Sequence, residues 1–207
     1  MSAAHPAAHA AADTAGTVVV AGPGRRLRRA ERREQILGAA TRAFARAGFT
    51  ATSLDDVAAE AGITRVILYR HFESKADLYR AVLDRARNKL AAAVGTGDYG
   101  DDAIPALIRA AAADPGAFRL LFRHAAREAE SRDQADSLSA ASAEVAKRDL
   151  APQIPPGPWL DWAARLIPAL TTEAVIAWLD VGQPDPSQAA ERIGQVISGA
   201  IQAAQPR

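Results

Sequence analysis

The side chains best suited to chemistry lie between residues 52 and 65, and they are hydroxyls followed by a cation. Thr52 and Ser53 precede a helix-like stretch, so their hydroxyls and the free N–H groups of a helix start would form an anion site. Thr64 and Arg65 open a second such stretch, and a guanidinium can donate two hydrogen bonds to guanine. The structural alternative is that Ser53 and Thr64 only cap the two helices.

The segment around these residues is basic. Between Arg25 and Lys75 the formal charge is +5, and the rest of the chain carries −4, which together give the net +1 of the sequence. A strongly positive segment in a nearly neutral chain is typical of proteins that contact a polyanion such as nucleic acid. The alternative is a basic face that serves only to be solvated.

Other classes of function find little support. The chain has no cysteine, and its four histidines lack metal-ligand spacing, so we expect no metal and no cofactor. It contains no nucleophile elbow, phosphate loop or dinucleotide motif, so we do not expect an enzyme. No apolar run reaches the roughly 18 residues that cross a bilayer, and residues 1–24 lack the basic start of a secretory signal. We predict a cytoplasmic protein with no membrane association, whose residues 1–24 form a disordered tail.

Helical periodicity predicts the elements that position the hydroxyls and cations. A first helix, with Phe44 on its apolar side, begins near residue 29 and stops at Gly48. Two short helices follow, capped by Ser53 and Thr64 and joined by a tight turn at Gly62, which is the arrangement of a helix-turn-helix. A fourth helix runs from about 75 to 94. We therefore predict a three-helix domain over residues 25–75, connected by this fourth helix to the remainder, 76–207.

The remainder is also expected to be helical. Residues 95–100 form a glycine-rich linker, Asp101 or Asp102 opens a helix, and another begins at Asp114. Residues from about 116 to 152 form one long helix or two successive helices, and we favour a break near residues 131–133. A proline-rich loop at 152–158 precedes an apolar helix that Pro168 should kink. We expect Ser187 to cap the last helix. The fold class is thus all-α, with about nine helices.

Residues 44–78, FARAGFTATSLDDVAAEAGITRVILYRHFESKADL, resemble the TetR (tetracycline repressor) family of transcriptional regulators. The matching positions are Phe44, Gly48-Phe49, Thr52-Ser53, Ala61-Gly62-Ile63-Thr64, Leu68-Tyr69, His71-Phe72, Lys75 and Leu78. The resemblance implies a helix-turn-helix that binds operator DNA, a C-terminal half that binds a small-molecule effector, and a homodimer. It implies repression more than activation. A helical adaptor or ligand-binding protein that has lost operator binding is the alternative.

The resemblance also assigns roles to individual residues. Tyr69 and His71 match the pair that contacts phosphate in the family, and Lys75 matches its phosphate-binding lysine. The structural alternatives are packing for Tyr69, an internally bonded histidine for His71 and a plain surface charge for Lys75. The predicted DNA contacts are Arg29, Arg33, Thr52, Ser53, Thr64, Arg65, Val66, Ile67, Tyr69, Arg70, His71 and Lys75.

Two features are particular to this sequence. Val66 and Ile67 stand where the family commonly has Gly or Ala followed by Thr or Ser, so an apolar contact with a thymine methyl group would replace a hydroxyl contact. The second feature is the stretch GRRLRRAERR from Gly24 to Arg33, immediately before and within the first helix, which resembles a basic extension that in members of the family can reach the minor groove. A solubilising basic tail is the alternative for these arginines.

In the C-terminal half, the resemblance implies an effector cavity and a dimer interface built from the last two helices, about 158–181 and 187–204. Aromatic side chains and a histidine are the candidates for an apolar effector pocket: Phe118, Phe122, His124, Trp159 and Trp162. Packing in the core is the alternative for each of these aromatic residues. For the interface we expect Trp178, Leu179, Ile197 and Ile201.

Overall fold

The structure is a computed structural model that describes residues 28–95, 100 and 102–206. The predicted tail (residues 1–24) lies outside the described residues, as does most of the predicted linker. Within the described part, nine α-helices, one π-helical turn and two 3-10 turns make up the regular structure, and there is no strand. The all-α fold class predicted from the sequence is confirmed.

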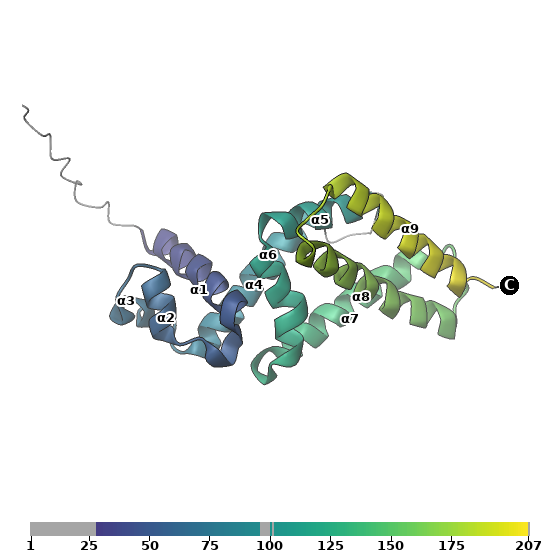
Figure 1. Cartoon of the computed structure of the whole chain (residues 1–207). Coiled ribbons are helices and arrows are strands. Elements are labelled where there is room, and N and C mark those ends of the chain that lie inside the picture. Colours follow the sequence, from purple (N-terminus) through teal and green to yellow (C-terminus); the bar gives the residue numbers. More distant parts are fainter. Residues whose placement is uncertain (1–27, 96–99, 101, 207) are drawn as a thin grey trace, which may run out of the picture.

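The first three helices form a helix-turn-helix domain (Figure 1). They are α1 (Arg29–Ala51), α2 (Leu54–Glu60) and α3 (Arg65–Tyr69). The Ser53 hydroxyl accepts the Asp56 N–H at the start of α2, and the Thr64 hydroxyl accepts the Ile67 N–H at the start of α3. Both predicted caps are therefore present. The predicted stop at Gly48 is a break inside α1, where φ is 76°, a left-handed value that suits glycine.

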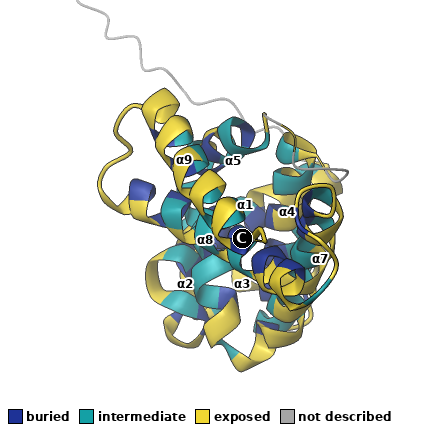
Figure 2. Ribbon diagram, turned by 90° about the vertical axis from the view of Figure 1, so that its right-hand side faces the viewer, coloured by how far each residue is buried: buried dark blue, intermediate teal, exposed yellow. Residues whose placement is uncertain are grey.

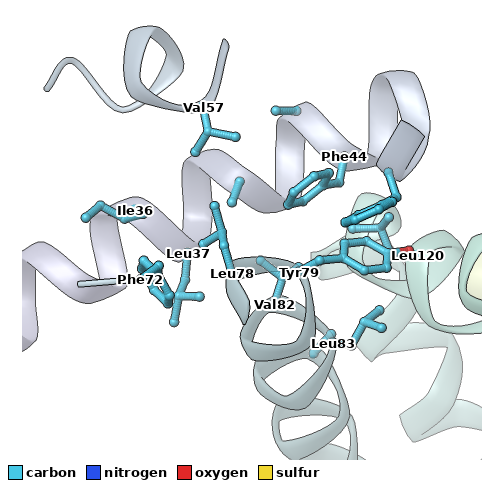
Figure 3. Packing of buried hydrophobic residues seen from close by; sticks show 14 of the residues in the cluster. Ile36, Leu37, Phe44, Val57, Phe72, Leu78, Tyr79, Val82, Leu83 and Leu120 are labelled. Carbon is cyan, nitrogen blue, oxygen red and sulfur yellow. The ribbon is translucent and has the colours of Figure 1, made fainter. Parts of the chain in front are cut away.

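A single core joins this domain to the next helix, α4 (Lys75–Val94). Phe44, Phe49 and Tyr79 pack ring against ring, with centroids 4.9 Å apart for Phe44–Tyr79 and 5.0 Å for Phe49–Tyr79. Figure 3 shows Phe44 on α1 facing Tyr79 on α4, with Leu120 of the C-terminal half beside them. We call this the first core. It already contains side chains from both halves of the chain.

The C-terminal half continues from α5 (Ala103–Ala113) and α6 (Pro115–Arg119). A π-helical turn, Leu120–His124, and two 3-10 turns, Ala125–Arg127 and Ala129–Ser131, lead into α7 (Arg132–Leu150). The helix break expected near residues 131–133 is thus confirmed. The structure adds the irregular stretch before it, which the sequence did not predict.

The last two helices are α8 (Pro158–Asp180) and α9 (Pro186–Ala204). α8 is one continuous helix across Pro168. The predicted cap of α9 was wrong: the Asp185 carboxylate accepts the N–H groups of Ser187 and Gln188, and Pro186 occupies the first turn. An aspartate before a proline is the better start signal, because the proline lacks the N–H that a helix start leaves unpaired. No helix among the described residues is long and apolar enough to cross a membrane.

Two further cores stabilise the C-terminal half. The second core lies between α5, α6, α8 and α9 and contains Phe118, Val175, Ile176 and Trp178. The third core lies at the other end of α8, where Leu160 and Ile167 pack against α7 and α9. The two ends of α8 therefore pack in different cores. This separation determines which of the predicted effector residues can line the same pocket.

Candidate nucleic-acid interface

The outward face of α3 is the centre of the candidate interface. Leu68 is fully buried and Phe72 nearly so, and these two side chains anchor the short helix in the first core. The opposite side is therefore exposed, and 63% of Val66 and 45% of Tyr69 are accessible. Arg65 and Arg70 are also exposed, whereas Ile67 is half-buried.

Arg65 is held in place by two neighbours. Its Nη1 donates to Asp55 Oδ2 at 3.0 Å, and its Nη2 donates to the Tyr69 hydroxyl at 3.2 Å. The guanidinium carbon also lies 5.5 Å from the centre of the Tyr69 ring. These contacts with Tyr69, and then the Asp55 charge, raise the pKa of Arg65. A guanidinium has about five N–H donors, so most of them remain available to a ligand.

The start of α2 is held together by its own hydrogen bonds. Ser53 N–H and its hydroxyl both donate to Asp56 Oδ2, at 2.8 and 2.7 Å. These bonds lower the pKa of Asp56, since they favour the ionised carboxylate. Ser53 is exposed, but its hydroxyl hydrogen is engaged, so it offers an incoming phosphate chiefly an acceptor.

Thr52 was wrongly predicted to contact DNA. It is 3% exposed, and its hydroxyl donates inward to the Gly48 and Ala43 carbonyl oxygens, at 2.7 and 3.3 Å. The Gly48 carbonyl oxygen lies in the last turn of α1, which leaves it without a helical N–H donor, and the Thr52 hydroxyl supplies one. Its role is to close the end of α1.

Lys75 has the same kind of structural role. Its ammonium donates to the carbonyl oxygens of Phe49, Thr50 and Thr52, at 2.9, 3.4 and 3.1 Å, and it lies 4.3 Å from the centre of the Phe49 ring. An ammonium has about three N–H donors, and all of them are used. The structure therefore corrects the expectation that Lys75 is free to bind a phosphate: it ties the first turn of α4 to the end of α1.

A basic cluster flanks the α3 face on one side. Burial first, and then the charges of Arg29, Arg33 and Arg32 on α1, lower the pKa of His71. Arg33 also lies over the Phe72 ring, 5.0 Å from its centre. We call Arg29, Arg32, Arg33 and His71 the arginine–histidine cluster. Among the predicted contacts it unites Arg29, Arg33 and His71, and it adds Arg32, which the sequence pattern did not single out.

The five predicted effector residues do not form one pocket. Phe118 is buried in the second core, with the ring of Phe122 4.8 Å away, and His124 is half-buried. Trp159 and Trp162 are 64% and 41% exposed and contact each other at the opposite end of α8. With a rise of about 1.5 Å per residue, a helix places residues 159 and 175 some 24 Å apart. The tryptophans therefore cannot line a pocket with Phe118.

Two hollows lie near α4. A crevice of about 10 Å³, the space of one water molecule, is lined by Leu83, Leu121, Ala125 and Leu138. A larger open groove of about 790 Å³ runs over α1 and α4 and has a charged lining that includes Arg33, Arg80 and Arg85. Among the described residues, no group of three or more His, Cys, Asp or Glu side chains could hold a metal ion.

The predicted interface residues point largely into the chain's own core. Trp178 and Leu179 are 6% and 4% exposed, and Trp178 Nε1 donates to the Pro184 carbonyl oxygen at 2.6 Å. Both are thus corrected to core residues. Ile197 and Ile201 are half-buried against the second and third cores. The exposed large apolar residues in this part of the chain are Trp159, Trp162, Val181 and Val196. Much of the surface of α9 is exposed (Figure 2).

Comparison with known proteins agrees with this geometry. The family model described as "Bacterial regulatory proteins, tetR family" matches residues 36–82, from the middle of α1 to the middle of α4. Over these residues the chain is similar to the tetR family. FasR, a transcriptional activator of Mycolicibacterium smegmatis, is 45% identical over 71 residues, or 34% of this chain and 32% of FasR. The regulator TtgR of Pseudomonas putida is 50% identical over 54 residues, or 26% of each chain.

The C-terminal half is matched by fold alone. A TetR-like regulator from Rhodococcus superposes with a TM-score of 0.69 and 22% identity, over 86% of this chain and 99% of that one. NalD of Pseudomonas aeruginosa superposes with a TM-score of 0.64 and 22% identity, over 83% and 96%. The curated relatives are matched over about a third or less of their length. The family model ends at residue 82, within α4, so it covers the helix-turn-helix domain and no helix after α4.

Replacing Lys75 with methionine separates the two roles considered for it. We expect Lys75→Met to lower the free energy of unfolding by about 1–3 kcal/mol, because backbone carbonyls lose their donor. Chemical denaturation measures this, with Lys89→Met, an exposed lysine on the same helix, as the control. If instead stability is unchanged and the slope of log affinity against log salt concentration falls by about one, Lys75 contacts a phosphate.

We expect DNA binding to depend on pH through His71. A nearby phosphate favours the imidazolium and opposes the burial and arginine charges that lower the pKa of His71. The bound form thus has the higher pKa, and affinity should rise as the pH falls through that value. It should level off below the pKa of the free protein. Fluorescence anisotropy across this range tests it, and a His71→Gln variant with the same pH profile would contradict it.

Proposed function

We propose that this protein is a sequence-specific transcriptional regulator of the tetR family that binds operator DNA as a homodimer. The observation that carries the proposal is the outward face of α3, flanked by the arginine–histidine cluster. An exposed helix face of this kind fits the major groove, while neighbouring cations neutralise phosphates and fix the register.

The exposed side chains suggest how bases are distinguished. Arg65, held by Asp55 and Tyr69, presents a guanidinium suited to the two acceptors of guanine. Val66 is exposed beside it and suits a thymine methyl group. Tyr69, Arg70 and His71 lie toward the end of α3, where they suit phosphate contacts, and Ser53 and Thr64 flank the helix starts. Ile67 contributes mainly packing, because it is half-buried.

We further propose that the protein is a cytoplasmic repressor released from DNA by a small apolar effector. The names of two relatives support regulation in either direction, since FasR is called an activator and BepR of Brucella suis a repressor. The effector would favour the conformer whose two α3 helices are wrongly spaced for the operator.

The proposed dimer uses the outer face of α8. Trp159, Trp162, Leu166 and Ala169 follow one another at three- and four-residue steps along α8, and each is exposed or half-buried. An exposed apolar stripe on one helix suits a second copy of the same helix related by a two-fold axis. Two copies also supply the two α3 helices that a palindromic operator requires.

A mobility-shift assay on the DNA flanking the protein's own gene tests the proposed function. We expect the wild type to shift a duplex in the presence of competitor DNA. Arg65→Ala should weaken this by about 1–3 kcal/mol, or roughly 5- to 150-fold, since a bidentate base contact is lost. Arg109→Ala, an exposed arginine on α5, is the control and should bind normally. Equal binding of random and flanking DNA would contradict the proposal.

A charge on the α8 stripe tests the dimer. Ala169→Glu places a carboxylate at a position exposed in one copy, so the protomer should fold. In the dimer the same charge would be buried without a partner, which costs about 3 kcal/mol or more and weakens association at least about 100-fold. Sedimentation equilibrium measures it, with Ala140→Glu on the exposed side of α7 as the matched control. A dimer equally stable in both variants would place the interface elsewhere.

A further inference from the structure

Glu128 links the two halves of the chain through one hydrogen bond. It lies in extended conformation between the two 3-10 turns that follow the π-helical turn, with φ of −106° and ψ of 131°. Its Oε1 accepts the Phe49 N–H at 2.7 Å, across 79 residues of sequence. Phe49 follows the break at Gly48, where α1 is no longer regular, so a side chain from the C-terminal half takes this amide.

The surroundings fix this contact closely. A Cβ atom on Gly48 would lie 3.3 Å from Glu128 Oε1, so glycine leaves room for the carboxylate. Ser131, which is 1% exposed, holds the turn that carries Glu128 by donating to the Ala125 carbonyl oxygen at 2.8 Å. The other carboxylate oxygen, Oε2, is buried without a hydrogen-bond partner, and so is the Tyr79 hydroxyl. Burial first, and then Glu128, raise the pKa of Tyr79.

On one side of Glu128 the contacts lead to the DNA-binding helices. Phe49 donates its N–H to Glu128, and its carbonyl oxygen accepts from Lys75. The Lys75 ammonium also holds the Thr52 carbonyl oxygen, one residue before the Ser53 cap of α2. A movement of Glu128 therefore changes the position at which α2, and with it α3, starts relative to α4.

On the other side the contacts lead into the effector half. The segment from 117 to 125 belongs to two cores at once: Leu120 and Leu121 pack in the first core, whereas Phe118 packs in the second. Arg119 and Arg123 bind Asp180 at the end of α8, each at 2.9 Å. The segment contains a π-helical turn, a rare conformation that is frequent at functional sites. Repacking of the second core thus displaces the turn that carries Glu128.

We propose that Glu128 is the positioning residue through which the C-terminal half sets the orientation of the DNA-binding domain, by holding the Phe49 N–H. The inference rests on the proposed function, since it concerns how operator binding is controlled. Coupling between two sites is reciprocal. Operator binding must therefore change the segment around Glu128, which allows a test without any effector.

Hydrogen–deuterium exchange on the full chain provides the test, with a duplex recovered by binding-site selection on the wild type as the probe. In the wild type we expect the duplex to protect residues 53–72 directly. Exchange in residues 117–131 should also slow by about five-fold, the lower end of coupling between sites. Glu128→Ala should keep the first effect and lose the second.

Two further variants make the result specific. Glu128→Gln keeps an acceptor oxygen at the same reach and should behave as the wild type. Glu128→Asp keeps the charge but withdraws it by one methylene, so it should lose the coupling even if the alanine variant does not fold. Failure to recover a duplex, or no protection of residues 53–72, would contradict the proposed function itself. Protection there without slowing in 117–131, or equal slowing in the Asp and wild-type proteins, would overturn the role of Glu128 alone.

Discussion

The burial of Leu68 and Phe72 is the constraint on which the candidate interface depends. α3 has only five residues, and an isolated helix of that length is not stable in water. It exists because these two side chains are fixed in the first core, against α1 and α4. The same anchoring decides which side chains face outward, so packing in the core determines what the surface of α3 offers to DNA.

The first core also explains why the two halves of the molecule cannot move independently. It contains side chains of α1 to α4 together with Ala117, Leu120, Leu121 and Ala125 of the C-terminal half. Packed interiors tolerate few intermediate arrangements, so a change in the packing of the C-terminal half displaces the helices of the DNA-binding domain. The hydrogen bonds of Phe49 to Glu128 and Lys75 determine which part of the DNA-binding domain moves with the C-terminal half.

Much of this could be predicted from the sequence, because local signals and long-range packing agree over residues 29–94. The caps at Ser53 and Thr64, the break at Gly48 and the outward position of Val66 follow from propensity and periodicity. Thr52 and Lys75 could not be placed in this way, since their partners are backbone carbonyl oxygens at the end of α1. In the sequence, a hydroxyl or ammonium group in a basic segment cannot be assigned to a phosphate or to a backbone carbonyl oxygen.

In the C-terminal half, less of the packing could be predicted from the sequence. Apolar periodicity identifies the buried side of a helix but not what covers it, so Trp178 was expected at an interface and lies in the second core. Trp159 and Trp162 were expected in a pocket and are exposed, because α8 is long enough for its two ends to pack in separate cores. Glu128 carries no local signal at all, since its partner is 79 residues away.

The central claim is that the outward face of α3 contacts base edges as one of a symmetric pair. Binding-site selection with the wild-type protein and with Arg65→Ala tests it most directly. We expect a pseudo-palindromic site whose half-sites lie apart by about one helical turn of DNA, roughly 34–36 Å, or by a multiple of it. We also expect the variant to lose discrimination at one symmetric base pair and to keep the rest. A selected site without two-fold symmetry, or the same preference at every position in both proteins, would contradict it.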